Sequence, residues 1–427
     1  MRSLPSTIPA CPNLQSLLLS MGFIRRRTSR HEIKGDLHYV IKSDLDGILS
    51  NNPSIVRLII GNASIDWGVI SKYKNITELD LTNCTTDPRS AASHFMDVCA
   101  QLESLSVSYI NLPGLLETVV ENDDFFMNMK MITIQCIFDI PGYVLLEIAR
   151  RCQNLESLQF KVFLRNELNA TTTDDFVQLV INDSWPKLQR LSYGYDGPKM
   201  SEVDTANVLR ALKGCCQWDV PVSTLSPFSF QVLKEHFLTL TDLNVENQAN
   251  MTSGLMQEIL CSCPRLRMFR GVEIQAKDIA EGYPWVCLSL RYLSIFIATE
   301  PESAIVTSTL NAKSDKLQRE VFERLSSLGK LSALKIGNAK ITDKSKFKYG
   351  LSLRLDKGLD HLGLLTELEY LDFSGTIQAM EEHDIEWMLS HWKHLKIMSG
   401  TCCYHNGYQN LDLGKILRLH QIRTDSS

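Results

Sequence analysis

An apolar pattern with fixed internal spacing recurs along this chain of 427 residues and limits what the chain can fold into. In each copy, apolar residues occupy a first position and the positions three and five residues later, as in NLESLQF and LEYLDF. Clear copies begin at residues 14, 55, 76, 102, 129, 155, 188, 240, 266, 290, 331, 368 and 395. A weaker copy at Cys215 divides the gap of 52 residues between two of them and makes fourteen. Such a chain is expected to stack similar units instead of building one globular core.

Two neighbouring columns of the pattern indicate a strand in every copy. Three residues after the start, all fourteen copies are apolar, and one residue later twelve of fourteen are polar, with Leu18 and Ile59 as the exceptions. The copies were chosen by their leucines, so the polar column is the independent evidence. Alternation with a period of two predicts a strand with one buried face and one face in water.

A third column, three residues before each start, follows runs with helical apolar spacing such as YVLLEIARRC and DIEWMLSHW. Each unit therefore reads as strand, loop and helix. Parallel strands joined by right-handed crossovers stack about 4.8 Å apart, because no unit can bury its apolar side alone. We predict an α/β leucine-rich-repeat solenoid, curved, with parallel strands on the concave face, helices outside, and repeats of roughly 26 residues.

The spacing of the repeats also predicts the domain organisation. Residues 1–400 form the solenoid, with insertions near 23–46, 299–316 and 344–356 that we expect to loop out on the surface. Residues 401–427 leave the pattern and form a cap or tail, in which KILRLHQI suggests a short helix. The first insertion carries the basic run Arg25–Arg30; a solvated loop is favoured over a phosphorylation, localisation or partner site.

The repeats resemble a known family. A unit near 26 residues with Cys before the strand, and tails such as KITD at 340–343 and NCTTD at 83–87, resembles the cysteine-containing repeats of F-box proteins over residues 11–400. The C-terminal stretches VFERLSSLGKLSALKIG and EEHDIEWMLSHWKHLKIMSG are similar to fungal F-box/leucine-rich-repeat proteins of the ribonuclease-inhibitor-like superfamily. The resemblance implies client recognition for a cullin-based ubiquitin ligase. The ten residues before Cys11 are too few for the three helices of an F-box, so a ligase adaptor is expected to bind only if an F-box is supplied.

Charge and motifs exclude several other functions. A net charge of -5 and a pI near 6.1 provide no basic field for nucleic acid. No signal peptide and no run of about 18 apolar residues is found, so we expect no membrane partner and a cytoplasmic or nuclear location. The common nucleotide, zinc and serine-hydrolase motifs are missing, and an enzyme would need a nucleophile and base that we do not find, so we predict no enzyme and no cofactor.

Two groups of reactive side chains have structural explanations. Cys261, Cys263, Cys215, Cys216 and the Cys402–Cys403 pair could supply zinc ligands, but no second pair lies at finger spacing. The column that holds Cys11, Cys99, Cys152, Cys263 and Cys287 also holds Leu, Phe and Trp, so we predict buried, unreactive thiols. The run 381–384, EEHD, suggests acid/base chemistry, but carboxylates at a helix start favour the positive end of its dipole.

The remaining candidate is a protein-binding surface on the solvent-exposed face of the strands. Its C-terminal half gathers aromatic, Met and Arg residues in adjacent repeats, a composition typical of binding hot spots. The alternative is that the later insertions fold over these residues. We expect Asp242 to pair with Arg270 in the unbound protein. The predicted partner-binding residues are Asp242, Asn244, Met268, Arg270, Tyr292, Phe296, Lys335 and Tyr370. A leucine-rich-repeat scaffold with no ubiquitin role is the alternative interpretation.

Overall fold

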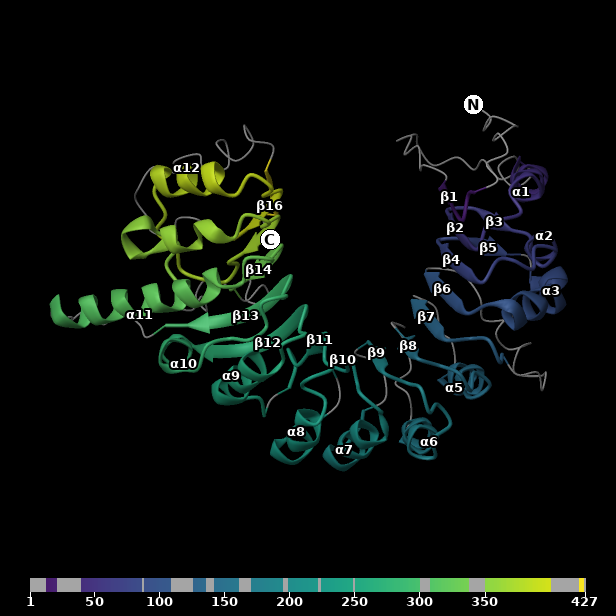
Figure 1. The fold of residues 1–427 in the computed structure, drawn as a ribbon, viewed down its shortest axis with the longest axis horizontal. Helices are drawn as coiled ribbons and strands as arrows, with labels where there is room; N and C mark the ends of the chain where they lie inside the picture. Colours follow the sequence, from purple (N-terminus) through teal and green to yellow (C-terminus); the bar gives the residue numbers. More distant parts are fainter. Residues whose placement is uncertain are drawn as a thin grey trace, which may run out of the picture. The chain divides into compact units, whose positions relative to one another are not determined.

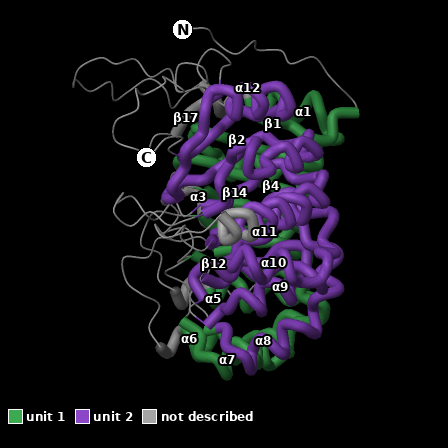
Figure 2. The backbone as a smooth tube through the Cα atoms, turned by 90° about the vertical axis from the view of Figure 1, so that its left-hand side faces the viewer, with its two compact units in different colours: residues 1–215, 222–224 green, residues 216–221, 225–427 purple. Residues whose placement is uncertain are grey.

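The structure, a computed structural model, describes residues 13–20, 40–86, 88–108, 126–135, 142–160, 170–194, 199–221, 224–248, 250–299, 308–337, 350–400 and 422–425. It divides into two compact units, one of residues 1–215 and 222–224 and the other of residues 216–221 and 225–427 (Figure 2). We call them unit 1 and unit 2. The basic run Arg25–Arg30, Cys11 and all of the segment KILRLHQI except its last residue, Ile422, lie outside the described residues.

Unit 1 has parallel strands that follow one another in chain order, with its helices together on one side of them (Figure 1). A second, two-stranded sheet pairs β3 (Ser64–Ile65) with β5 (Thr85–Thr86). The strands of the main sheet are β1 (Ser16–Ser20), β2 (Arg57–Gly61), β4 (Glu78–Thr82), β6 (Ser104–Ser108), β7 (Met131–Gln135), β8 (Ser157–Phe160) and β9 (Arg190–Tyr193). The helices are α1 (Val40–Asn51), α2 (Trp67–Ile70), α3 (Pro88–Gln101), α5 (Gly142–Arg150), α6 (Ala170–Ile181) and α7 (Glu202–Ala211).

Unit 2 repeats this arrangement, again with helices on one side of parallel strands (Figure 1). Its strands are β10 (Gln217–Asp219), β11 (Asp242–Asn244), β12 (Met268–Gln275), β13 (Tyr292–Ala298), β14 (Ala333–Lys335), β15 (Tyr370–Asp372), β16 (Ile397–Ser399) and β17 (Arg423–Asp425). Its helices are α8 (Pro227–Lys234), α9 (Ser253–Ser262), α10 (Ala276–Glu281), α11 (Ser308–Ser326), the short 3-10 helices η2 (Leu355–Lys357) and η3 (Leu359–Leu364), and α12 (Glu382–His391). These features confirm the predicted α/β leucine-rich-repeat solenoid.

The predicted phase of the repeat is also confirmed. Every one of the fourteen copies contains a strand that begins two residues after the start of its pattern. The apolar residue three positions after the start is buried in each, from Leu17 to Met398. Neighbouring strands align these residues with one another, as in Ile132 with Leu158 and Leu334 with Leu371. The core of each unit therefore lies between the strands and the helices.

One hydrogen-bond arrangement joins successive repeats. The N–H groups of Glu156 and Ser157 both donate to the carbonyl of Lys130, at 2.7 and 3.0 Å. The same arrangement, two consecutive N–H groups on the carbonyl that precedes the neighbouring strand, recurs from β2 to β16 wherever both partners are described within one unit. It fixes the register at the beginning of each strand.

The column before each strand forms the turn that leads from helix to strand. The carbonyl of Cys152 accepts from the N–H of Leu155 at 3.2 Å, and Cys99, Cys263 and Cys287 make the equivalent bond. The Cys152 thiol donates back to the carbonyl of Ile148 at 3.3 Å, within the end of its helix. A small, weakly polar side chain fits this position because it fills the core and satisfies a helix carbonyl.

One insertion differs from the prediction that the insertions loop out on the surface. In the described part of the segment near 344–356, Leu351 and Leu353 are buried in the core of unit 2. From residue 308, the segment near 299–316 belongs to α11, which has 19 residues. The two leucines of the segment near 344–356 explain the difference, because burial of an apolar side chain away from water stabilises the fold. The sheet also reaches into residues 401–427, where β17 pairs in parallel with β16.

Substitution of a leucine in the strands tests the phase. We expect Leu158→Ala to lower the free energy of unfolding by about 2–5 kcal/mol, because the leucine is fully buried and the change leaves a cavity. Thr133→Ala, one position off the core column on neighbouring β7, should lower it by less than about 1 kcal/mol. Urea denaturation followed by circular dichroism measures both. Equal losses at the two positions would contradict the assigned phase.

Candidate functional site

Apart from Phe296, the predicted partner-binding residues lie on the strand side of unit 2, opposite its helices. Backbone register brings them into two rows that cross the strands. One row aligns Asp242, Met268, Tyr292, Ala333 and Tyr370, and the other aligns Asp219, Asn244, Arg270, Ser294, Lys335 and Asp372. Positions far apart in sequence thereby become neighbours.

Four side chains on adjacent strands alternate between cation and aromatic ring. The guanidinium of Arg270 on β12 lies 5.5 Å from the centre of the Tyr292 ring on β13. The Lys335 Nζ on β14 lies 6.0 Å from the same ring and 5.0 Å from that of Tyr370 on β15. We call the following four residues, which come alternately from the two aligned rows, the cation–aromatic row: Arg270, Tyr292, Lys335 and Tyr370. All four are partly exposed, where each cation–π contact contributes about 0.5–1 kcal/mol.

Each cation of the row has a carboxylate nearby. Arg270 lies 3.6 Å from Asp219, and Lys335 lies 3.8 Å from Asp372. Partial burial alone would lower the pKa of Lys335, but the Tyr292 and Tyr370 hydroxyls and the Asp372 carboxylate together raise it above its ordinary value. Lys335 therefore stays charged at neutral pH, and the stability that its charge contributes is lost only as the pH rises through its raised pKa.

Hydrogen bonds orient the groups beside the row. The Tyr370 hydroxyl donates to Asp372 Oδ2 at 3.2 Å, and the N–H of Ser374 donates to Asp372 Oδ1 at 2.9 Å. At the β10–β11 end, Asn244 Nδ2 donates to Asp219 Oδ1 at 2.7 Å. These hydrogen bonds fix the positions of the Asp219 and Asp372 carboxylates. The carboxylates in turn restrain the paired cations of Arg270 and Lys335.

Two details of the sequence prediction need correction. Arg270 pairs with Asp219 and not with the predicted Asp242, because Asp219 is in the same row while Asp242 is in the other. Phe296 is only 5% exposed. Between Arg270 and Glu273 the β12–β13 register shifts, and this irregularity ends the simple alternation before Phe296.

The structure brings together the other predicted residues. Met268 is aligned with Tyr292 and is half-buried, and Asp242 is partly exposed beside it. Asp219 and Asp372 were missing from the predicted set although both contact it. Their signal was present in the sequence, because both belong to the polar column that follows each core position.

Four cysteines of the column that precedes the strands behave as core side chains. Cys99, Cys152, Cys263 and Cys287 are buried and carry free thiols. Burial raises the pKa of Cys152 and of Cys287 to about 12, and it also raises those of Cys99 and Cys263. A thiol with so high a pKa is almost entirely protonated at neutral pH and is a poor nucleophile or metal ligand. Cys402 and Cys403 lie outside the described residues.

Thiol labelling tests this assignment. At pH 8, a group with a pKa near 12 is a thiolate in about one molecule in ten thousand, so native Cys152 and Cys287 should react slowly with a disulfide reagent. Cys216, which is partly exposed, should react faster than either of them. Mass spectrometry after brief labelling, with and without denaturant, identifies the modified residues. Rapid labelling of Cys152 in the native protein would contradict the core assignment.

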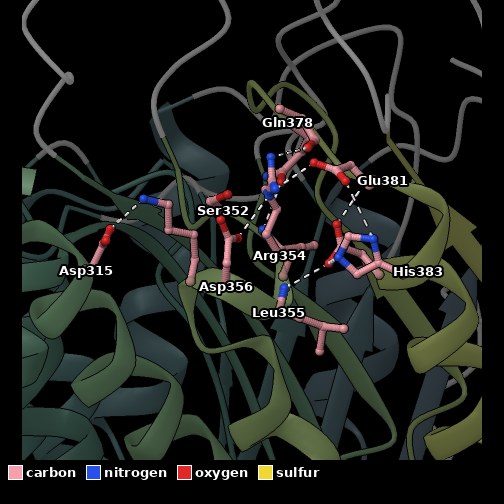
Figure 3. A network of polar contacts seen from close by, with 12 residues as sticks. Asp315, Ser352, Arg354, Leu355, Asp356, Gln378, Glu381 and His383 are labelled. Carbon is pink, nitrogen blue, oxygen red and sulfur yellow. Dashed lines mark hydrogen bonds and ion pairs between the residues drawn. The ribbon is translucent and has the colours of Figure 1, made fainter.

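The EEHD run near the start of α12 belongs to a polar network with the segment that precedes η2 (Figure 3). Asp384, which is fully buried, accepts the N–H of Glu381 at 2.8 Å and the N–H of Leu355 at 2.9 Å through its two oxygens. Arg354 donates to Glu381 Oε1 at 2.7 Å and to Asp356 Oδ1 at 3.0 Å. His383 Nε2 lies 3.4 Å from Asp384 Oδ1. The helix-start interpretation is confirmed by a capping box formed by Glu381 and Asp384.

Side-chain amides hold the same segment from both sides. Gln378 accepts the N–H of Leu353 and donates to the carbonyl of Leu351, at 3.0 and 2.8 Å. Gln318 on α11 does the same for Ser352, accepting its N–H at 2.9 Å and donating to its carbonyl at 3.1 Å. The network therefore satisfies backbone groups that no neighbouring strand pairs, and its role is structural.

Asp384→Asn tests that role. The amide supplies one acceptor oxygen where the carboxylate has two, so one of the two N–H groups loses its partner, and the free energy of unfolding should fall by about 1–3 kcal/mol. Glu382→Gln, an exposed first-turn control, should change it by less than about 0.5 kcal/mol. Thermal melts of both variants measure the difference. No loss for Asp384→Asn would show that the two bonds contribute little.

Comparison with known proteins adds little beyond the fold. No known family model matches the chain, and no curated protein matches it. Solved structures similar to it include an internalin of Listeria monocytogenes, with 12% identity over 90% of this chain and 88% of that one and a TM-score of 0.39. A leucine-rich-repeat protein of Leptospira interrogans has 13% identity, coverage of 88% and 91%, and a TM-score of 0.36. The yeast complex of Rad7 and Elc1 contains a chain with 11% identity, coverage of 90% and 87%, and a TM-score of 0.44.

Membrane-spanning helices and metal-binding clusters are both missing from the described part of the chain. The described residues include no helix that is both long and apolar enough to cross a membrane. Within the same residues, no three His, Cys, Asp or Glu side chains come together as a group that could hold a metal ion.

Proposed function

We propose that this protein binds another protein through the strand side of unit 2, at a surface centred on the cation–aromatic row. The observation that carries the proposal is the partly exposed alternation of Arg270, Tyr292, Lys335 and Tyr370 on four adjacent strands. Tyr and Arg are the side chains that dominate binding energy in protein interfaces. A rigid sheet presents them without the entropy cost of ordering a loop.

The surroundings of the row favour this function over a structural one. Its side chains extend from the strand side, whereas the residues that stabilise the fold point to the opposite side. Half-exposed rings retain apolar area whose burial by a partner contributes about 25 cal/mol per Å². Neither α11 nor the packed segment 350–358 buries these four residues, which all keep partial exposure.

The narrower function is recognition of a client for ubiquitin ligation. Its support is the sequence resemblance of residues 11–400 to the repeats of F-box proteins. A cytoplasmic or nuclear location agrees with that function. The alternative, a leucine-rich-repeat scaffold with no ubiquitin role, uses the same surface and predicts the same binding residues.

Partner capture by single variants tests the binding surface. Tyr292→Ala should weaken recovery of cross-linked partners from cell extract by at least about fivefold, because an interface anchor contributes more than about 1 kcal/mol. Tyr283→Ala removes a tyrosine that is 83% exposed elsewhere in unit 2 and is the matched control. Quantitative mass spectrometry compares the two variants with the wild type, and melting temperatures verify folding. Equal recovery with Tyr292→Ala and with wild type would place the interface elsewhere.

A further inference from the structure

We propose that the cation–aromatic row takes an acidic, extended segment of the partner protein, with two carboxylates about three residues apart. One carboxylate would bind Arg270 and the other Lys335, on either side of Tyr292. This inference rests on the proposed function and specifies the chemistry that the surface recognises.

The exposure of the charges is the first argument. The side chains of Arg270 and Lys335 are each 30% exposed, whereas their counter-ions Asp219 and Asp372 are 16% and 6% exposed. A molecule that approaches the strand side therefore meets the cations before the carboxylates. The groups offered to a partner are positive and aromatic even though the whole chain is acidic.

The internal ion pairs are also weak enough to share their cations. Their N···O separations of 3.6 and 3.8 Å exceed the 2.7–2.9 Å of a strong charge-assisted hydrogen bond. An incoming carboxylate can approach more closely without breaking a short bond. The Tyr292 ring, in contact with both cations, would be covered by the side chain between the two carboxylates.

The spacing of the strands sets the spacing of the partner's charges. Arg270 and Lys335 belong to the same row on β12 and β14, two strand separations apart. Two separations of about 4.8 Å span about 10 Å. A chain in the extended polyproline II conformation covers this distance in about three residues, and its three residues per turn place the first and fourth side chains on the same side. The proposed segment thus crosses the strands with its first and fourth residues acidic.

The neighbouring charges restrict where the segment can lie. Asp242 and Glu246, both partly exposed on the β11 side, would repel further carboxylates there. The acidic part of the segment is therefore confined to the region over β12, β13 and β14. This limit distinguishes a specific acidic segment from a long polyanion.

Synthetic peptides test the inference against the full chain. Peptides of one length carry two glutamates at sequence positions i and i+1, i and i+3, or i and i+5, with leucine at any position between them. Each peptide has a control copy with glutamine in place of both glutamates. Fluorescence anisotropy at low salt measures affinity. The glutamate pair three positions apart should bind at least about tenfold more tightly than its glutamine copy and more tightly than the other spacings.

Variants of the chain assign the binding to the row. Arg270→Gln and Lys335→Gln should each weaken that peptide by at least about fivefold, and exposed Lys330→Gln, the control, should not. Asp242→Asn should tighten binding because it removes a repelling charge. Melting temperatures within a few degrees of wild type verify that Arg270→Gln and Lys335→Gln are folded.

Several results would overturn the inference. They are equal binding of glutamate and glutamine peptides, binding unaffected by both cation variants, no binding of the glutamate pair, or equally tight binding of a single-stranded oligonucleotide. If Tyr292→Ala still lowers partner capture in any of these cases, the surface binds a protein of other chemistry and only this inference fails. If Tyr292→Ala also leaves partner capture unchanged, the proposed function fails as well.

Discussion

The structure depends on the paired hydrogen bonds that join the start of each strand to the repeat before it. Two consecutive N–H groups donate to one carbonyl, as those of Arg291 and Tyr292 do to that of Arg267 at 2.8 and 3.1 Å. Because the pairing fixes the register, each apolar core residue is aligned with the core residue of the neighbouring strand, and each strand-side residue with its counterpart. The alternation of Arg270, Tyr292, Lys335 and Tyr370 exists only because the register is kept through four strands.

This dependence explains what the sequence could predict. Period-two alternation and the apolar columns specify strand positions and buried faces locally, so all fourteen strands were predicted with their phase. The half-buried surface was predicted for the same reason, since adjacent repeats place equal positions side by side. Seven of the eight predicted site residues remain on that surface, either partly exposed or, like Asn244, hydrogen-bonded to a member of it.

The errors arose where non-local packing decides the outcome. Phe296 follows the alternation in sequence, but a shift in register between β12 and β13 precedes it and the side chain is buried. The partner of Arg270 depends on which aligned row a carboxylate occupies, whereas Asp242 was predicted because it lies in the adjacent repeat. The segment near 344–356 was expected in solvent because it exceeds the repeat length, whereas Leu351 and Leu353 pack into the core with glutamine amides replacing strand partners.

Those glutamine amides have a consequence for how unit 2 opens. In a plain repeat array, each unit contacts only its neighbours, so a terminal unit can detach alone. Here Gln318, from the repeat that begins at residue 290, and Gln378 and Asp384, from the repeat that begins at residue 368, all bind backbone groups of the repeat between them. Detaching one of these repeats leaves backbone groups of another without their hydrogen-bond partners. Three successive repeats are thus expected to open together, and two of them carry the strands of Lys335 and Tyr370.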